Sequence, residues 1–192
     1  MPYLVKPEHL VDPVTEPIPA DESLPRACVI GAGASGIAAA KALYLAGLPF
    51  DWFERGSAIG GNWLFNNPNG LSACYETLEI NTSCPRMAFS DFPMPDDYLP
   101  YARHDQVHDY FENYIDHFGF RHTVTFNTEV VDVVRTNDGW RVRTNGPDGE
   151  QEGRYDAVLV ANGHHWDPRW PEPAYPGHFT GEQIHAHDYR SG

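Results

Sequence analysis

The segment from Cys28 to Ala40 constrains the fold of this chain more than any other stretch. Apolar residues lead directly into Gly31, Gly33 and Gly36, and small or apolar residues follow. This G-x-G-x-x-G spacing is typical of a strand, a tight turn and a helix that bind a dinucleotide. The first glycine permits the turn, the second leaves room for a pyrophosphate, and the third lets the helix pack against the strand. The amide groups and the positive end of the helix would face the phosphate.

A second strand is predicted over 48–53, after Gly47 ends the helix. Glu54 follows 18 residues after Gly36, close to the position of the acidic residue that binds a ribose hydroxyl in such folds. A carboxylate there repels a 2′-phosphate, so the site favours FAD or NAD over NADP. The alternatives are that the glycines form a simple turn and that Glu54 is only a solvated charge at a strand end.

The remaining patterns predict an α/β fold. Apolar residues at three- and four-residue steps predict a helix over 104–118, ended by Gly119. A strand is predicted over 123–126, and the apolar run 155–161 is typical of a strand buried on both faces. Periodicity does not decide between a strand and a helical turn over 75–80.

Asn137-Asp138-Gly139 predicts a hairpin between strands at 130–135 and 140–144. We therefore expect a three-layer, Rossmann-like domain over 26–163, with a mostly parallel sheet and a β-hairpin or meander insertion. Six prolines within the first 25 residues exclude regular helix or central strand there, so 1–25 is interpreted as an irregular surface arm.

Composition excludes several classes of function. The formal net charge of −14 argues against binding to nucleic acid or to anionic membranes, because both require a basic surface. The sequence shows no signal peptide and no stretch that could span a membrane, so we expect a cytoplasmic protein. Three scattered cysteines and the histidine pairs do not form a metal-ligand pattern. A nucleophile-elbow motif of a hydrolase is not found.

Several further motifs resemble the class B flavoprotein monooxygenases, specifically the flavin-containing monooxygenase branch. The most specific is the segment 179–189, which fits the family signature F-x-G-x-x-x-H-x-x-x-Y at every fixed position. The other matching segments are the GGxW-like turn Gly60-Gly61-Asn62-Trp63, the stretch 78–83 followed by 87–93 that resembles L-x-x-N-T-S … M-x-F-S-D-F-P, and the A-T-G-H-like turn at 161–164.

The resemblance implies FAD bound at the first glycine turn. Asn81 would be the catalytic residue, beside the isoalloxazine ring, where related enzymes use an asparagine to support the oxygenated flavin. The implied cofactor-binding residues are Gly31, Gly33, Ala34, Ser35 and Gly36 at the pyrophosphate, Glu54 at the ribose, Arg55, Gly61, Asn62 and Trp63 on the flavin side, Val130 at the adenine, Thr82 beside Asn81, and Ala161, Asn162 and Gly163 near the cofactor. The alternatives are that Asn81 only caps a turn and that Trp63 only packs in the core.

The implied chemistry is carried by the cofactor. In this family NADPH reduces FAD, and the reduced flavin takes up O₂ as a C4a-(hydro)peroxide. One oxygen atom then passes to a soft nitrogen or sulfur nucleophile, while the protein excludes water. Tyr189 stands where Baeyer–Villiger members usually carry tryptophan, which favours the flavin-containing branch. Cys84 stands where many members carry lysine, so the role of that position is open.

The sequence contains no second G-x-G-x-x-G. We therefore expect that the NADPH domain is absent from this chain, and that 164–192 is a linker that carries the family signature towards it. The chain would then be a partial one, or another chain would supply the C-terminal half, and a homo-oligomer is a further expectation. Such a chain would bind FAD without NADPH-driven turnover. The alternatives are a Baeyer–Villiger monooxygenase and a non-catalytic FAD-binding or assembly module.

Overall fold

The structure is a computed structural model that describes residues 17–192. Its helices and strands are, in chain order, β1 (Ala27–Ile30), α1 (Ala34–Leu45), β2 (Phe50–Phe53), α2 (Cys84–Met87), α3 (His104–His117), β3 (Val124–Thr125), β4 (Glu129–Thr136), β5 (Gly139–Gly146), β6 (Gly149–Tyr155) and β7 (Ala157–Val160). Short 3-10 helices lie at Gly61–Trp63, Arg121–Thr123 and Ala186–Asp188. The predicted arm 1–25 lies partly outside the described residues, and its part 17–25 forms no helix or strand.

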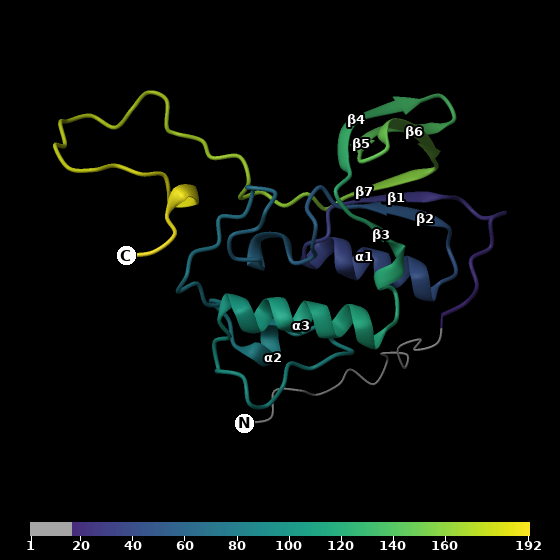
Figure 1. The fold of residues 1–192 in the computed structure, drawn as a ribbon, viewed down its shortest axis with the longest axis horizontal. Coiled ribbons are helices and arrows are strands. Elements are labelled where there is room, and N and C mark those ends of the chain that lie inside the picture. The colour runs from purple at the N-terminus through teal and green to yellow at the C-terminus, as the bar shows by residue number, and fades with distance from the viewer. Residues whose placement is uncertain (1–16) are drawn as a thin grey trace.

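A four-stranded parallel sheet forms the middle of the molecule, in the order β3-β2-β1-β7 (Figure 1). β1 lies between β2 and β7, so that Val29 is opposite both Trp52 and Leu159. The chain passes from β1 through α1 to the neighbouring strand β2, which is the arrangement that the glycine spacing predicts. The α/β class with a parallel sheet is confirmed.

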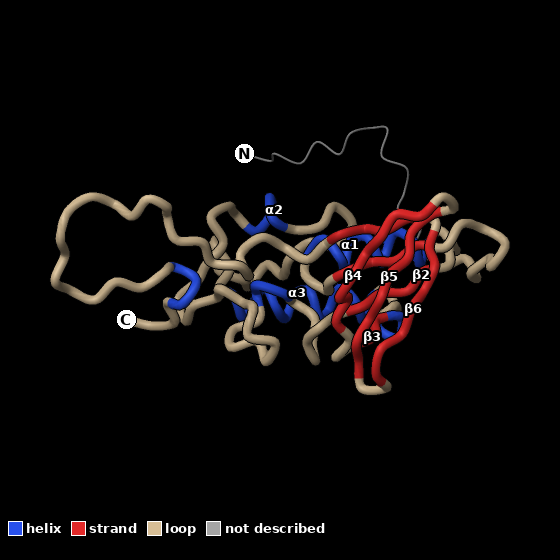
Figure 2. Tube along the Cα trace, turned by 90° about the horizontal axis from the view of Figure 1, so that it is seen from above, coloured by secondary structure: helices blue, strands red, loops and turns tan. Residues whose placement is uncertain are grey.

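Alternate residues of the parallel sheet face different layers. Val29 and Trp52 face α1 and α3 and belong to the larger apolar core. Cys28, on the opposite face, packs with Val142 and Tyr155 of the antiparallel sheet β4-β5-β6. Helices therefore cover one face of the parallel sheet and the antiparallel sheet covers the other, as Figures 1 and 2 show. The three-layer prediction is confirmed.

Both long helices end at the glycine that the sequence predicts. Gly47 has φ +65°, and its amide donates to the Tyr44 carbonyl while the amide of Leu48 donates to the Leu43 carbonyl. Gly119 has φ +72° at the end of α3. Glycine adopts this left-handed conformation at little cost, so both chain reversals are encoded locally.

The strand predicted over 155–161 is confirmed as β7 but is shorter, and the prediction that it is buried on both faces is wrong. β6 ends at Tyr155 and β7 begins at Ala157, because Asp156 pairs twice with Arg26 and turns the chain between them. The Asp156 amide donates to the Arg26 carbonyl at 2.8 Å, and the Arg26 amide donates to Asp156 Oδ2 at 2.7 Å. β7 is an edge strand of the sheet, so Val160 remains 67% exposed.

The hairpin at 137–139 is confirmed, and β6 extends it into a three-stranded meander. β6 was not predicted from the sequence because its residues are mostly polar and exposed. The strand expected at 123–126 is shortened to β3. The segment 75–80 forms neither a strand nor a helix, and only Glu79 makes an isolated bridge, with Arg103.

The tail 164–192 leaves the body as an exposed excursion and returns at its end (Figure 1, yellow). The Glu76 amide donates to the Arg190 carbonyl at 2.8 Å, and the Arg190 guanidinium donates to the Ser72 carbonyl at 3.1 Å. Across residues 17–192, none of the helices is long and apolar enough to span a membrane.

Candidate functional site

The glycine-rich turn starts where β1 ends, at the carboxyl edge of the parallel sheet. Gly31 has φ +96°, and its amide donates to the Phe53 carbonyl at 2.8 Å. A Cβ atom on Gly31 would lie 2.7 Å from the Ala161 carbonyl oxygen, and one on Gly36 would lie 1.8 Å from the Gly31 carbonyl oxygen. The packing of the protein itself therefore requires both glycines.

Gly33 differs, because no contact with the described residues 17–192 requires a glycine there. Its φ of −82° is ordinary, and a Cβ atom would meet only Gly61 Cα, at 3.7 Å. Gly33 is the N-cap of α1, which has no side-chain cap and no acidic residue in its first turn. The amides of Ala34 and Ser35 have no hydrogen-bond partner among residues 17–192. The free amides and the open space above Gly33 fit a pyrophosphate group.

Glu54 is buried, with 6% exposure, so the alternative of a solvated strand-end charge is wrong. Its Oε2 accepts from the Ala32 amide and its Oε1 from the Gly56 amide, both at 2.7 Å. These two hydrogen bonds to backbone amides were not predicted from the sequence. A carboxylate has about four acceptor positions, so Glu54 retains capacity for a ribose hydroxyl, and that role stays a prediction.

The turn at Gly60 and Gly61 packs directly on the glycine-rich turn. The Gly60 amide donates to the Ala32 carbonyl at 2.9 Å, and Gly60 and Gly61 both have positive φ. A Cβ atom on Gly61 would lie 3.0 Å from Gly33 Cα. Two glycine-containing turns, far apart in sequence, thus touch at one point of the sheet edge.

Asn62 and Trp63 follow in the 3-10 helix Gly61–Trp63. Asn62 Oδ1 accepts from the Ala73 amide at 2.9 Å, and the Ser72 hydroxyl donates to the Asn62 carbonyl at 2.9 Å. Trp63 is partly buried and packs against the larger core. The Asn62 side-chain oxygen therefore has a structural partner already, and contacts of both residues with a flavin stay predictions.

Arg55, which was expected on the flavin side, and Val130, which was expected at the adenine, both lie next to Glu54. The Thr128 amide donates to the Glu54 carbonyl at 2.9 Å, which brings the start of β4 to the end of β2. Arg55 Nη1 lies 3.4 Å from a carboxylate oxygen of Glu129, and Val130 is the next residue along β4. The fold thus gathers Glu54, Arg55 and Val130 at one corner of the parallel sheet.

The turn after β7 also reaches the glycine-rich turn. The Ala161 amide donates to the Ile30 carbonyl at 2.9 Å, and a Cβ atom on Gly31 would approach Asn162 Cα to 3.4 Å. Asn162 and Gly163 are exposed, and Gly163 has φ +72°. The structure therefore brings these residues to the same edge as the glycines, where parallel sheets place their ligands.

Asn81 and Thr82 lie on a different segment. Both are exposed, in a loop held by two backbone bonds, from the Ile80 amide to the Ala102 carbonyl and from the Cys84 amide to the Pro100 carbonyl. In the described part of the chain, neither residue hydrogen-bonds to the glycine-rich turn. Backbone hydrogen bonds flank their loop on both sides, and their contact with a flavin stays a prediction.

All three cysteines are buried, which disfavours reaction of their thiols. Burial raises the pKa of the Cys28 thiol to about 12 and that of Cys74 to about 11. Both groups stay protonated near neutral pH, and the thiolate is the reactive form. Cys84 is also buried, and its thiol contacts the Leu99 carbonyl at 3.0 Å.

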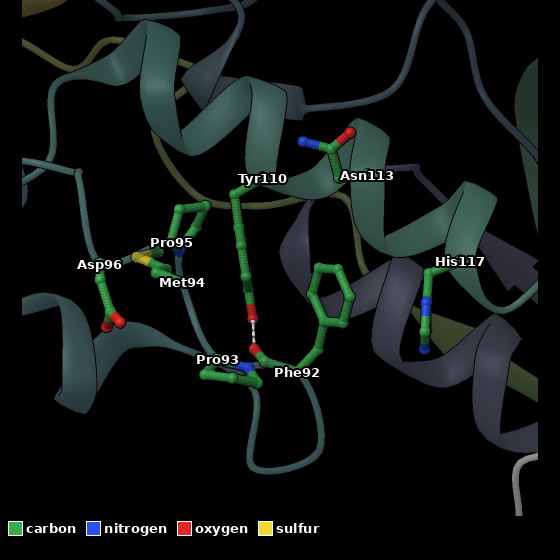
Figure 3. A pocket seen from close by; sticks show the side chains of 8 residues that line it. All are labelled: Phe92, Pro93, Met94, Pro95, Asp96, Tyr110, Asn113 and His117. Atoms are coloured by element: carbon green, nitrogen blue, oxygen red, sulfur yellow. Dashed lines mark hydrogen bonds between the residues drawn. The ribbon is translucent and has the colours of Figure 1, made fainter.

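A hollow of about 580 Å³ lies between α3 and the loop that follows α2 (Figure 3). The Tyr110 hydroxyl donates to the Phe92 carbonyl at 2.5 Å and accepts from the Phe89 amide. The Tyr110 hydroxyl is thus occupied within the protein, and Asp96, Asn113 and His117 are the other polar side chains that line the hollow. The hollow contains none of the predicted site residues, so we place the functional site at the sheet edge instead.

Comparison with known proteins decides the family. A family model described as flavin-binding monooxygenase-like matches residues 25–192. The chain belongs to this family. The resemblance noted in the sequence is confirmed, and the open glycine-rich turn is the part of this family member that fits a dinucleotide.

Named relatives agree with this assignment. Flavin-containing monooxygenase 5 of Rattus norvegicus is 37% identical over 175 residues, which cover 86% of this chain and 33% of that protein. The structure of S-allyl-L-cysteine S-oxygenase from Allium sativum matches with a TM-score of 0.74 and 33% identity, over 86% of this chain and 42% of the other. Cyclohexanone monooxygenase matches with a TM-score of 0.63 and 27% identity, over 77% and 28%. This family member thus spans about a third of the length of the curated relatives it matches.

Proposed function

We propose that this family member is the FAD-binding part of an NADPH- and O₂-dependent monooxygenase. The observation that carries the proposal is the sheet edge at which the glycine-rich turn, the Gly60-Gly61 turn and the turn after β7 meet. At its centre, a Cβ atom on Gly33 would make only an ordinary contact with Gly61 Cα among residues 17–192, and free amide groups lie beside it at the start of α1. These features match the needs of a dinucleotide pyrophosphate.

Different residues would then contact different parts of the cofactor. The amides of Ala34 and Ser35 would hold the pyrophosphate, and Glu54 the adenosine ribose. The Val130 backbone would meet the adenine. Arg55, Gly61, Asn62, Trp63 and the turn 161–163 would line the flavin side. Asn81 and Thr82 would orient the reacting face and help to exclude water.

FAD, when bound, supplies the transfer of electrons and the activation of O₂. The substrate we propose is a small molecule with a soft nitrogen or sulfur nucleophile. We propose that 26–163 forms the FAD domain and that 164–192 is the linker towards an NADPH site elsewhere in the complete protein or on a partner chain. One relative is named for S-oxygenation and another for N-oxide formation.

Titration of the full chain with FAD, followed by flavin fluorescence, tests the site. Gly33→Asp places a carboxylate in the proposed pyrophosphate space, and we expect FAD affinity to fall at least about 100-fold through charge repulsion. Ala42→Asp adds the same charge at an exposed position of α1 and should leave affinity unchanged. Wild-type affinity in the Gly33→Asp variant would overturn the placement.

A Baeyer–Villiger activity is the second candidate, favoured by the fold shared with cyclohexanone monooxygenase. Product analysis on the complete protein distinguishes the two. With NADPH and O₂, we expect a thioether or an amine to be oxygenated and a cyclic ketone to remain unchanged. Formation of the lactone instead would establish the second candidate.

A further inference from the structure

Trp52 places a hydrogen-bond donor beneath the glycine-rich turn. Its side chain is fully buried on β2, and its ring stacks on Phe120 with centroids 6.0 Å apart. The indole Nε1–H donates to the Gly31 carbonyl oxygen at 2.9 Å. No motif in the sequence marks this residue, and the prediction of the site did not include it.

The Gly31 carbonyl depends on this donor. Gly36 packs so closely over it that a Cβ atom there would lie 1.8 Å from the oxygen. The first bond of α1 goes elsewhere, from the Ile37 amide to the Gly33 carbonyl. Within residues 17–192, Trp52 makes the only hydrogen bond to the Gly31 oxygen. The bond is partly buried. Because a partly buried carbonyl without a partner costs free energy, the indole stabilises this orientation of the peptide.

Glu54 holds the other end of the same peptide unit. The Gly31 carbonyl and the Ala32 amide lie in one plane, and that amide donates to Glu54 Oε2 at 2.7 Å. Trp52 and Glu54 are two residues apart, so they project to the same face of the chain as it leaves β2. One side chain therefore fixes the oxygen of the peptide and the other fixes its hydrogen.

We propose that Trp52 is a positioning residue for the cofactor site. Together with Glu54 it clamps the Gly31–Ala32 peptide, and this sets the direction of the amide groups that follow at the start of α1. Rotation of the peptide would break both bonds and turn those amides away from a bound pyrophosphate. The identity of the ligand rests on the proposed function, whereas the clamp exists in the protein without a ligand.

Trp52→Phe tests the proposal, because it keeps an aromatic ring against Phe120 and removes the indole donor, together with the volume of the second ring. On the full chain without FAD, we expect the Ala32 amide to exchange its hydrogen about tenfold faster, measured by NMR relative to other core amides. With FAD, we expect the Kd to rise about tenfold. Trp170→Phe is the matched control, because Trp170 is 55% exposed in the tail, and it should change neither value.

The outcomes separate the two proposals. If the wild type binds no FAD but Trp52→Phe still accelerates Ala32 exchange, the proposed function fails and the clamp stands. If the wild type binds FAD and Trp52→Phe leaves both Ala32 exchange and the Kd unchanged, or speeds exchange throughout the core alike, the clamp is refuted. If Trp52→Phe does not fold, the hydrogen-exchange rate of the Trp52 indole N–H in the wild type tests the clamp. Slow exchange supports the clamp, and exchange as fast as that of the Trp170 indole overturns it.

Discussion

Gly33 and Gly36 stand three residues apart in one turn, yet a methyl group would act on them in different ways. At Gly36 the added carbon would lie 1.8 Å from the Gly31 carbonyl oxygen, a backbone atom that cannot yield easily. At Gly33 it would make only ordinary contact. We expect Gly36→Ala to lower the free energy of unfolding by about 2 kcal/mol or more, and Gly33→Ala by less than about 1 kcal/mol.

Urea unfolding of the two variants beside the wild type measures this difference. FAD titration completes the comparison. Gly33→Ala should fold, but it should bind FAD more weakly than the wild type does. If both variants lost the same free energy of unfolding, this would contradict the view that Gly33 serves ligand binding and Gly36 serves packing within the protein.

The buried thiols give a prediction on reactivity and pH. The folded-state pKa of Cys28 is raised from 9.0 to about 12 by burial and by the Asp51 carboxylate. A raised thiol pKa stabilises the fold fully below about pH 9, and this contribution is lost as the pH rises towards about 12. We expect the free energy of unfolding to fall across that range, and less steeply in Cys28→Ala.

A thiol reagent at about pH 8 provides an independent measurement. Native protein should react slowly at all three cysteines, since each is buried, whereas protein in urea should react at all of them at once. Rapid labelling of Cys28 in the native state would contradict the buried placement.

At this scale the sequence predicted the glycines well and the hydrogen-bond partners poorly. Gly31 and Gly36 follow from backbone geometry, which a local motif encodes. Trp52 and the backbone contacts of Glu54 depend on how β2 lies against the turn, and that arrangement exists only after folding. The role of Asn81 was predicted from family resemblance alone, because the residues around it carry no periodic pattern.

At the scale of elements, a buried ion pair joins α1 to the loop after α2. Lys41 pairs with Asp91, with 9% and 13% of their side chains exposed, and its ammonium lies 3.9 Å from the centre of the Phe118 ring. Removing one partner leaves a buried charge uncompensated. We expect Lys41→Met to lower the free energy of unfolding by roughly 3 kcal/mol, and the double variant Lys41→Met/Asp91→Leu to recover part of that loss.

The exposed pair of Arg154 and Asp138 is the matched control, since 78% and 71% of these side chains are exposed. Arg154→Met should change the free energy of unfolding by less than about 1 kcal/mol. Chemical denaturation of the three variants provides the values. A Lys41→Met variant as stable as Arg154→Met would show that the pair does not anchor the loop.

Helices and strands that carry a local sequence pattern were predicted. Strands that depend on pairing with a distant part of the chain were not. α1, α3 and the hairpin follow from periodicity, glycine caps and turn residues. β6 is polar and exists because β5 offers it a partner along its whole length. The break before β7 could not be read from its apolar residues, because it depends on the pairing of Asp156 with Arg26, 130 residues earlier in the chain.

At the scale of the whole molecule, the returning tail connects the signature segment with the sheet edge where we propose that the cofactor binds. Arg190 bonds the Ser72 carbonyl, and the Ser72 hydroxyl bonds the Asn62 carbonyl in the predicted flavin-side turn. The Tyr189 ring also packs against Tyr75, with centroids 5.5 Å apart. The tail is otherwise exposed from 164 to 184, so its end is the part that holds it to the body.

Arg190→Ala should therefore release the tail and loosen the segment beneath it. We expect hydrogen–deuterium exchange to increase in peptides that cover 72–76 and 186–192, while exchange in α1 and β1 stays the same. Among residues 17–192, the guanidinium bonds only to these two segments. Arg169→Ala, at an exposed tail position, should leave all of these peptides unchanged. If Arg190→Ala alters exchange only in the peptide that contains the substitution, the aromatic contact and the backbone hold the tail. The side-chain link from Arg190 through Ser72 to Asn62 then does not hold the tail to the body.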